Sequence, residues 1–484
     1  MGHACSGFKK LYGITSSCFM NHPSIRVRFA PSPTGMLHIG GLRTALFNFL
    51  FARHHNGKFL VRIEDTDKER SLPVYTQAII NTLTWCSMAP DEPLVIQSER
   101  QAEHLRIAQQ LVQEGKAYYC YCTPEELQKR IAQTTIEGIS YARYDGFCKK
   151  FIGQSSDKPR VIRFLVPANC KQVVIEDAIK GQIVFSADTF DDFILVRSDG
   201  APMYNFVVVL DDAFMQISHI IRGEEHLINT PKQLLLYKAC GYMVPTFAHL
   251  PLILGPDGTK MSKRDAAANA YDYKERGYLP QALCNYLVRL GWSHGDQEIF
   301  SVPEMINAFS LNAISSKGAL FDTQKLDWVN SMHIKALSAD MLYQYMKEVM
   351  QLPLGTTVAS WSLRTMYLLI DLYKQRCTTL QALYRELVAL HSRPSVYEIA
   401  ELNHEQKQLL ESLITILSIQ EFTHTNLSHT IKEFCHTQEI KLSDLGPLIR
   451  IALTGKKDAP GIYDLMASLG KDETITRLKN YYRR

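Results

Sequence analysis

The sequence has no apolar run long enough for a membrane-spanning helix, which needs about 20 consecutive apolar residues, so we expect no membrane partner. It has no internal repeat and no low-complexity segment, which argues against a solenoid and an extended disordered chain. Its 11 cysteines are odd in number and scattered, so we expect no disulfide framework, and a cytoplasmic location. The net charge of +4 is small for 484 residues, so any surface for an anionic partner must be a local patch.

The length of the chain indicates several domains, and its first residues indicate an extension. A chain of 484 residues exceeds what one hydrophobic core usually serves, so three or more domains are expected. Residues 1–23 contain neither the apolar core of a signal peptide nor the arginines of a transit peptide. We therefore expect a flexible N-terminal extension, and Met20 is an alternative start.

Periodicity then predicts an α/β unit. "IRVRFA" (25–30) alternates as a strand does, and a loop rich in proline and glycine follows at 31–41. Residues 42–57 have a helical apolar face with Gly57 as the expected C-cap, and 58–65 form a second strand. A strand, loop, helix and strand in this order begin a parallel nucleotide-binding sheet.

Later segments indicate an insertion and then a helical half. Residues near 100–200 have turns of their own, and 123–126 make a good helix start. Residues 191–212 are predicted as buried strand with a turn at 198–202, and 249–265 as a buried strand, a turn and a basic loop. Beyond about residue 330 the patterns are those of amphipathic helices, so the architecture is an α/β half followed by a helical half.

Two loops carry the chemistry. In "PSPTGMLHIGG" (31–41) the glycines allow close approach, the following helix offers N–H groups to an anion, and His38 can stabilise a developing charge. In "KMSKR" (260–264) the basic residues surround Ser262 and suit phosphate groups. Each alone is more simply explained as a tight turn or a solvated basic loop. Together, in this order and with an α/β unit at the first, they favour a nucleotide site.

The two loops resemble the HIGH and KMSKS signatures of class I aminoacyl-tRNA synthetases. "RFAPSPTGMLHIGGLRTALFN", "RIEDTD", "HIIRGEEHLINTPKQ" and "GPDGTKMSKR" are similar to the bacterial glutamyl-tRNA synthetases, and the resemblance extends from about Ile25 to the end. Gly41 stands where the class pattern has histidine, as is usual in this subfamily. The resemblance implies a Rossmann-type parallel-sheet catalytic domain with an inserted acceptor-binding domain, followed by an all-α anticodon-binding half. The expected division is 24–102 with 203–258 (catalytic), 103–202 (insert), 259–338 (KMSKR loop and stem contact), 339–398 and 399–484 (two anticodon-binding domains).

The activity implied by the resemblance is two-step. Glutamate reacts with ATP, accompanied by Mg²⁺, and the glutamyl group then passes to the 3′ end of tRNA-Glu. Such chemistry needs mostly alignment and charge stabilisation, for which His38, Lys260 and Lys263 are the expected catalytic residues. The expected ATP site comprises His38, Gly40, Gly41, Lys260, Met261, Ser262, Lys263 and Arg264.

The amino-acid site implied by the family lies at strand ends. Arg28 and Arg222 can each hold a carboxylate bidentately, whereas a lone arginine is more often a surface ion pair. Glu64 can take the ammonium group. The expected glutamate site comprises Arg28, Ala30, Ser32, Glu64, Tyr204 and Arg222.

A zinc site is an open alternative. Cys120, Cys122 and Cys148 supply three thiols, but structural zinc usually has four ligands. Some family members have a fourth ligand at the position of Lys150, a poor donor, and Tyr144 is an alternative, as in a related tRNA-modifying paralogue. The other interpretation is a decayed site of partly buried cysteines.

The helical half is expected to bind the anticodon loop, with Arg376 as a candidate reader and a solvated helix-end arginine as the alternative. An enzyme that also charges tRNA-Gln is not excluded, and neither is a non-catalytic RNA-binding paralogue, although His38, Lys260 and Lys263 are retained. The family suggests a monomer.

Overall fold

The computed structural model describes residues 24–136, 139–153, 158–261, 269–354, 361–399 and 401–483. The chain divides into two compact units, Met1–Tyr271 with Cys284–Asp322 and Asp272–Leu283 with Thr323–Arg484. The predicted extension 1–23 lies outside the described residues. Among the described residues, no helix combines the length and apolar character needed to cross a bilayer.

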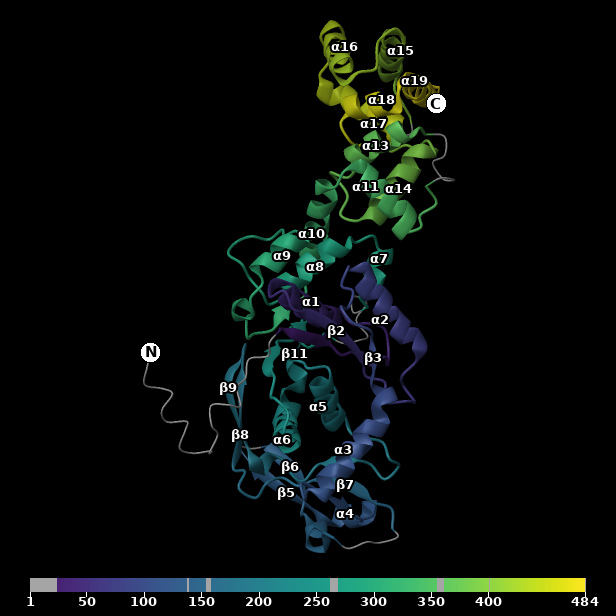
Figure 1. Cartoon of the computed structure of the whole chain (residues 1–484). Helices are drawn as coiled ribbons and strands as arrows, with labels where there is room; N and C mark the ends of the chain where they lie inside the picture. The colour runs from purple at the N-terminus through teal and green to yellow at the C-terminus, as the bar shows by residue number, and fades with distance from the viewer. Residues whose placement is uncertain are drawn as a thin grey trace, which may run out of the picture. The chain divides into compact units, whose positions relative to one another are not determined.

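The first unit is built on a seven-stranded sheet with the order β3-β2-β1-β11-β12-β8-β9. All neighbours pair in parallel except β8 and β9, which form an antiparallel hairpin at one edge. The predicted Rossmann-type parallel sheet is therefore confirmed (Figure 1). The strands are β1 Arg26–Phe29, β2 Lys58–Ile63, β3 Val95–Ile96, β8 Gln172–Asp177, β9 Gly181–Ser186, β11 His219–Gly223 and β12 Thr246–Leu250.

The helix α1 (Ile39–His54) connects β1 to β2, as the sequence pattern predicts, but it begins three residues earlier than the apolar periodicity indicates. Its N-cap is His38, so the glycines of the loop form its first turn. The C-cap is His55 and not Gly57. Gly57 is needed for another reason, because a Cβ atom there would lie 2.4 Å from the Ile25 carbonyl oxygen.

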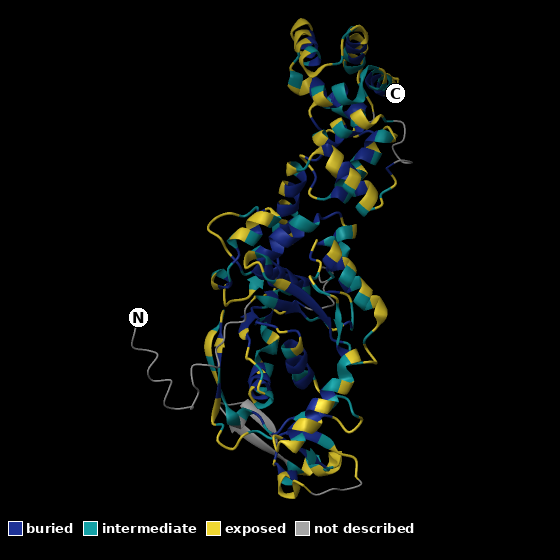
Figure 2. Ribbon diagram, in the orientation of Figure 1, coloured by how far each residue is buried: buried dark blue, intermediate teal, exposed yellow. Residues whose placement is uncertain are grey.

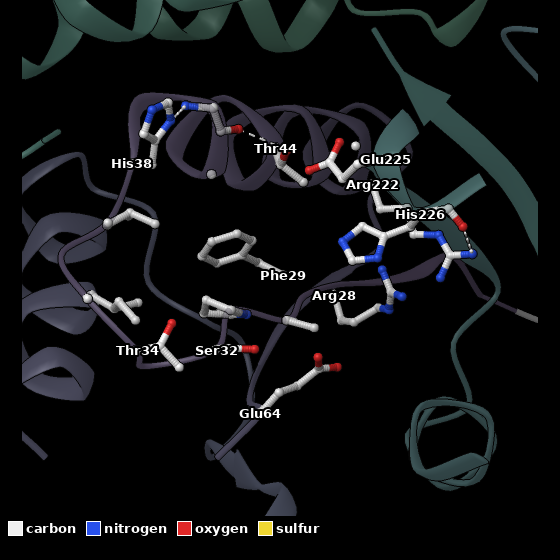
Figure 3. Close-up of a pocket in the computed structure, with 18 of the residues that line it drawn as sticks. Arg28, Phe29, Ser32, Thr34, His38, Thr44, Glu64, Arg222, Glu225 and His226 are labelled. Atoms are coloured by element: carbon white, nitrogen blue, oxygen red, sulfur yellow. Dashed lines mark hydrogen bonds between the residues drawn. The ribbon is translucent and has the colours of Figure 1, made fainter. Parts of the chain in front are cut away.

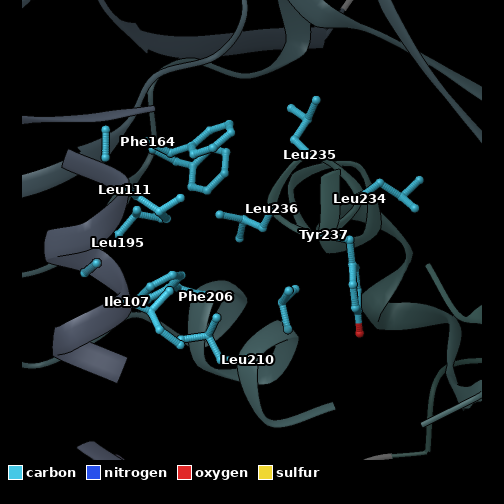
Figure 4. Close-up of a cluster of buried hydrophobic side chains, with 14 of the residues drawn as sticks. Ile107, Leu111, Phe164, Leu195, Phe206, Leu210, Leu234, Leu235, Leu236 and Tyr237 are labelled. Carbon is cyan, nitrogen blue, oxygen red and sulfur yellow. The ribbon is translucent and has the colours of Figure 1, made fainter. Parts of the chain in front are cut away.

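The prediction of strand over 191–212 is wrong in its second half. Only β10 (Ile194–Val196) is a strand, and the segment after the turn is the helix α5 (Tyr204–Phe214). Its β-branched run Val207–Val209 suggests a strand, but the helix is buried on nearly every side, and tertiary packing outweighs that preference. Figure 4 shows Phe206 and Leu210 of α5 packed among side chains of α3 (Gln101–Gln113) and α6 (Thr230–Cys240).

The inserted segment contributes strands to three sheets. The strands β10, β7 (Val161–Phe164) and β4 (Ala117–Cys120) form a three-stranded antiparallel sheet. β5 (Ile131–Ile136) and β6 (Ile139–Tyr144) form a hairpin. The strands β8 and β9 fall within the predicted insert but extend the main sheet. The helix α4 (Pro124–Arg130) begins with the expected pair, in which the Thr123 amide donates to Glu126 and the Glu126 amide to the Thr123 hydroxyl.

From Thr323 to the end, the described residues contain helices and no strand, so the predicted helical half is confirmed. Its helices are amphipathic: α14 (Leu380–His391) buries Leu380, Leu383, Leu387 and Leu390 at helical spacing, and Figure 2 shows such buried faces turned inward. The remaining helices and strands are α2 Pro73–Trp85, β13 Ile253–Leu254, α7 Asp272–Glu275, α8 Pro280–Arg289, α9 Val302–Ala308, β14 Ala319–Leu320, α10 Thr323–Ala336, α11 Ala339–Gln344, α13 Leu363–Tyr373, α15 His404–Ser418, α16 His424–Thr437, α17 Leu442–Thr454, α18 Ile462–Leu469 and α19 Lys471–Tyr482.

Candidate active site

A cavity of about 430 Å³ lies where the neighbouring parallel strands β2, β1 and β11 end. The carboxyl ends of parallel strands are the usual place for a ligand in such sheets. The cavity brings together every residue of the predicted glutamate site and part of the predicted ATP site. The predicted residues that line it are Arg28, Ala30, Ser32, His38, Gly40, Gly41, Glu64, Tyr204 and Arg222.

The loop after β1 is held in place by backbone contacts. The Glu64 amide donates to the Pro31 carbonyl oxygen at 3.0 Å, and the Ala270 amide to that of Leu37 at 2.9 Å. The Nδ1 atom of His38 accepts from the Gly40 amide at 3.0 Å, as an N-cap does. At Gly41 a Cβ atom would lie 2.9 Å from Leu37 Cδ1, which explains a small residue there.

A second cavity, of about 470 Å³, adjoins the first and shares His38, Gly40, Gly41, Thr44, Gly223 and Glu225 with it. Lys260 and Met261 line this second cavity, so the start of the basic loop lies beside the His38 loop, as the nucleotide hypothesis requires. Lys260 is exposed and Met261 is buried. The predicted residues Ser262, Lys263 and Arg264 lie outside the described residues.

Arg28 is buried and forms no surface ion pair. Its Nε donates to Asp212 Oδ1 at 3.0 Å and its Nη2 to Oδ2 at 3.3 Å. Arg62 donates to the same Asp212 at 2.6 Å and to Glu64 at 3.0 Å. Burial favours the neutral form of Asp212, but Arg28 and Arg62 outweigh it, so the pKa of this carboxyl lies below its usual value. Two of the three Arg28 nitrogens are thus fixed, which aims the guanidinium.

Glu64 directly follows β2 and is 7% exposed. Burial raises its pKa, and the neighbouring Arg62 only partly opposes this effect. A buried carboxylate with one cationic partner retains oxygen lone pairs for an ammonium group. The Glu64 side chain lines the cavity below Arg28 (Figure 3).

Arg222 lies at the penultimate position of β11 and is 5% exposed. Its Nε donates to His249 Nε2 at 3.2 Å, and its Nη2 donates to the Thr230 hydroxyl oxygen at 2.8 Å. Its Nη1 is buried without a hydrogen-bond partner among the described residues. Burial lowers the pKa of Arg222. An arginine stays charged in proteins, so this guanidinium is a buried cation with an unused donor beside the cavity.

The Tyr204 hydroxyl and His226 Nδ1 lie 3.1 Å apart. Burial and then the nearby Arg222 lower the pKa of His226 to about 4, so this histidine is neutral near pH 7. Burial raises the pKa of Tyr204 to about 12. The hydroxyl can therefore donate to His226 and turn its lone pairs toward the cavity.

The cavity therefore combines two buried guanidinium groups and a carboxylate, which match two carboxylates and an ammonium group. In Figure 3 Arg28 and Arg222 lie at one end and His38 at the other. Sequence reasoning missed four residues here: Asp212, Arg62, Glu225 and His226. Glu225 and His226 lie three and four residues after Arg222, so their nearness in the sequence could have indicated them, but Asp212 lies 184 residues from its partner Arg28.

The three predicted cysteine ligands do meet. The sulfur atoms of Cys120, Cys122 and Cys148 lie within 4.8 Å of one another. The Tyr144 hydroxyl is 3.5 Å from the sulfur of Cys120 and 3.6 Å from that of Cys122. A tetrahedral zinc ion with Zn–S bonds of about 2.3 Å separates its sulfurs by about 3.8 Å. The cluster thus has the size of a zinc site, and Lys150 is exposed.

Arg376 lies in the second unit beside a cavity of about 320 Å³. Its Nη2 pairs with Asp458 and its Nη1 donates to the Ala459 carbonyl oxygen at 3.3 Å. Lys456 and Thr378 also line this cavity. Arg376 is exposed and is held beside this cavity by these two contacts, and its role as an anticodon reader stays a prediction.

Comparisons with known proteins agree with this geometry. Residues 24–328 match the model of the catalytic domain of class I tRNA synthetases (E and Q), and residues 334–482 match an anticodon binding domain. The chain is 42% identical to the glutamate–tRNA ligases of Geobacter sulfurreducens and Thermodesulfovibrio yellowstonii, with 94% of this chain and 98% of each relative aligned. A crystal structure of a glutamate–tRNA ligase from Elizabethkingia meningosepticum, in complex with its amino acid, superposes with a TM-score of 0.83 at 33% identity, and the match covers 95% of this chain and 99% of that one.

Proposed function

The chain belongs to the glutamate–tRNA ligases of the class I tRNA synthetases, and we propose that its paired cavities hold glutamate and ATP side by side. It is a ligase that joins L-glutamate to tRNA at the expense of ATP. The cavity where Arg28, Arg222 and Glu64 meet next to the His38 loop supports the proposed residue roles.

The orientation of glutamate follows from the ends of the cavity. Arg28 and Arg222 hold the side-chain carboxylate, because they lie away from His38. Glu64 takes the ammonium group, and the Tyr204 and Ser32 hydroxyls add hydrogen bonds. The α-carboxylate is then left facing the second cavity. Glutamine would leave a buried guanidinium without its anion, which is how the site rejects it.

ATP occupies the second cavity, where its phosphates meet the N-terminus of α1 and Lys260. An oxygen of the glutamate α-carboxylate attacks the α-phosphorus, the bond to the bridging oxygen breaks, and pyrophosphate leaves. His38 and Lys260 stabilise the charge that develops on the phosphate oxygens. The sequence assigns Lys263 the same role, with Ser262 and Arg264 beside it.

Mg²⁺ is expected with ATP, since it is bound mainly through substrate phosphates and one or two carboxylates. Of the described residues that line the second cavity, only Glu225 carries a carboxylate, so it is the protein group that fits the ion. When bound, the ion neutralises phosphate charge.

Zinc at Cys120, Cys122 and Cys148, with Tyr144 as fourth ligand, is a further part of the proposal. Its support is the spacing of the three sulfurs and the hydroxyl within reach of two of them. A bound zinc ion would tie the end of β4 to the segment after β6 and stabilise the insert.

The helical half binds the anticodon loop, and Arg376 contacts a base there. The preferred substrate is tRNA-Glu, and the protein acts as a monomer in the cytoplasm. The predicted domain boundaries at 103, 203, 259, 339 and 399 belong to the same proposal.

The test is glutamylation of separate tRNA-Glu and tRNA-Gln transcripts with labelled glutamate, ATP and Mg²⁺. Charging of tRNA-Glu alone supports the proposal, and Arg376→Ala should then lower kcat/KM for tRNA-Glu by about tenfold or more, as loss of one base contact does. Charging of both transcripts means that the anticodon half does not discriminate. Charging of neither would contradict the proposed residue roles.

A further inference from the structure

Behind Arg222, and outside both cavities, lies a buried pair formed by His249 and Asp177. His249 lies on β12 directly beside Arg222 on β11, in parallel register. The Asp177 carboxylate is 2.6 Å from His249 Nδ1, and both side chains are fully buried. Neither residue lines the cavities around the His38 loop.

The hydrogen bonds assign the tautomer of His249. Asp177 also accepts from the backbone amides of Ile179, Lys180 and His249, so it is an ionised acceptor and His249 Nδ1 must carry a proton. The other ring nitrogen, Nε2, faces the Nε–H of Arg222 at 3.2 Å and the Thr230 hydroxyl at 3.1 Å. An arginine can only donate, so Nε2 must be an unprotonated acceptor.

We propose that His249 is a positioning residue for glutamate: as a neutral acceptor fixed by Asp177, it turns Arg222 so that its free Nη1 serves the substrate carboxylate. This rests on the proposed role of Arg222 in holding glutamate. His249 and Thr230 engage Nε and Nη2, which leaves Nη1 as a buried donor with no partner in the part of the chain that the structure describes. The substrate carboxylate supplies the missing acceptor.

The arrangement makes glutamate binding sensitive to acid. A proton on His249 Nε2 would place an N–H donor opposite the Nε–H donor of Arg222, and the hydrogen bond that positions Arg222 would be lost. The charged and titratable groups that face His249 are Asp177 from β8, Arg222 from β11, Arg28 from β1 and His226 from the turn after β11. Burial lowers the pKa of His249, Asp177 partly opposes this, and Arg222 and Arg28 lower it further. The acid limb therefore lies below the ordinary histidine pKa of about 6.5.

The experiment measures the KM for glutamate and the KM for ATP in tRNA-Glu glutamylation between about pH 7.5 and pH 5.5, a range that brackets an ordinary histidine. His249→Gln places an amide oxygen near the Nε2 position, an acceptor that does not titrate. His249→Leu removes the acceptor. His429→Gln, at an exposed histidine of α16, is the matched control.

For the wild type, the KM for glutamate should rise as the pH falls below the ordinary histidine pKa of about 6.5, while the KM for ATP changes little. His249→Leu should raise the KM for glutamate about ten- to a hundredfold at neutral pH, since a hydrogen bond to a charged group is lost. His249→Gln should restore a near wild-type value and flatten the acid rise, and this variant carries the test if the leucine variant fails to fold. A wild-type KM for glutamate in His249→Leu, or an unchanged acid rise in His249→Gln, would overturn the inference. A wild type that charges no tRNA would instead count against the proposed function.

Discussion

Replacing Asp212 by asparagine tests the charge network that aims Arg28. Asp212 is fully buried and accepts three hydrogen bonds, two from Arg28 and one from Arg62. The amide keeps one acceptor oxygen but turns an N–H donor toward a guanidinium, and it leaves two buried arginines without the charge of Asp212. Breaking one partner out of a buried ion pair costs about 3–5 kcal/mol, a large share of a typical unfolding free energy of about 5–15 kcal/mol.

The loss of stability in Asp212→Asn should depend on pH in a characteristic way. The pKa of Asp212 is lowered in the folded state, so its contribution to stability is fully present above the unfolded pKa of about 3.9 and is lost as the pH falls through the folded pKa. The stability difference between wild type and Asp212→Asn should therefore be constant near neutral pH and shrink in acid below about pH 4.

The assay for Asp212→Asn is urea unfolding followed by circular dichroism, with the KM for glutamate measured beside it. The KM should rise at least about tenfold, because Arg28 loses charge-assisted bonds that orient it. Asp67→Asn is the control, since Asp67 pairs with Arg70 at an exposed site, and it should leave both readouts unchanged. If Asp212→Asn shows a wild-type urea midpoint and a wild-type KM, the network does not position Arg28.

Three further predictions concern the site, the fold and the metal. Arg28→Ala should abolish glutamylation at ordinary glutamate concentrations yet keep the circular dichroism spectrum, because Asp212 retains Arg62 as partner; full activity would remove Arg28 from the site. Gly57→Ala should lower the unfolding free energy by about 1–3 kcal/mol, since its Cβ would lie 2.4 Å from the Ile25 carbonyl oxygen, whereas Gly35→Ala has open space around it and should be near neutral. Mass spectrometry of the metal content of gently purified protein should find about one zinc ion per chain, and Cys122→Ser should reduce this content. A zinc content well below one per chain in the wild type would contradict the proposed site.

The sequence pattern predicted the strands β1 and β2 and the helix between them because the signals there are local. Alternation in 25–30, the glycine loop and the apolar face of the next helix each act within a few residues, and β1, α1 and β2 confirm them. Local signals gave the wrong prediction for α5. Val207–Val209 favour a strand locally, but this segment is helical because it packs against α3 and α6.

Motif positions placed Arg28, Glu64 and Arg222 at strand ends, but nothing near them in the sequence indicates their partners. His249 reaches Arg222 because β12 lies beside β11 in the sheet, and Asp212 reaches Arg28 from the helix α5; in both cases the fold brings together segments far apart in the chain. Long-range pairing of this kind depends on topology, which single-sequence patterns do not encode.

The most direct test of the account compares kcat/KM for L-glutamate and L-glutamine in charging tRNA-Glu with the wild-type protein. Two buried guanidinium groups facing the substrate predict a preference for glutamate of about 10⁴-fold, because glutamine would leave a buried cation unpaired. Comparable use of the two amino acids would contradict the claim that Arg28 and Arg222 select a carboxylate.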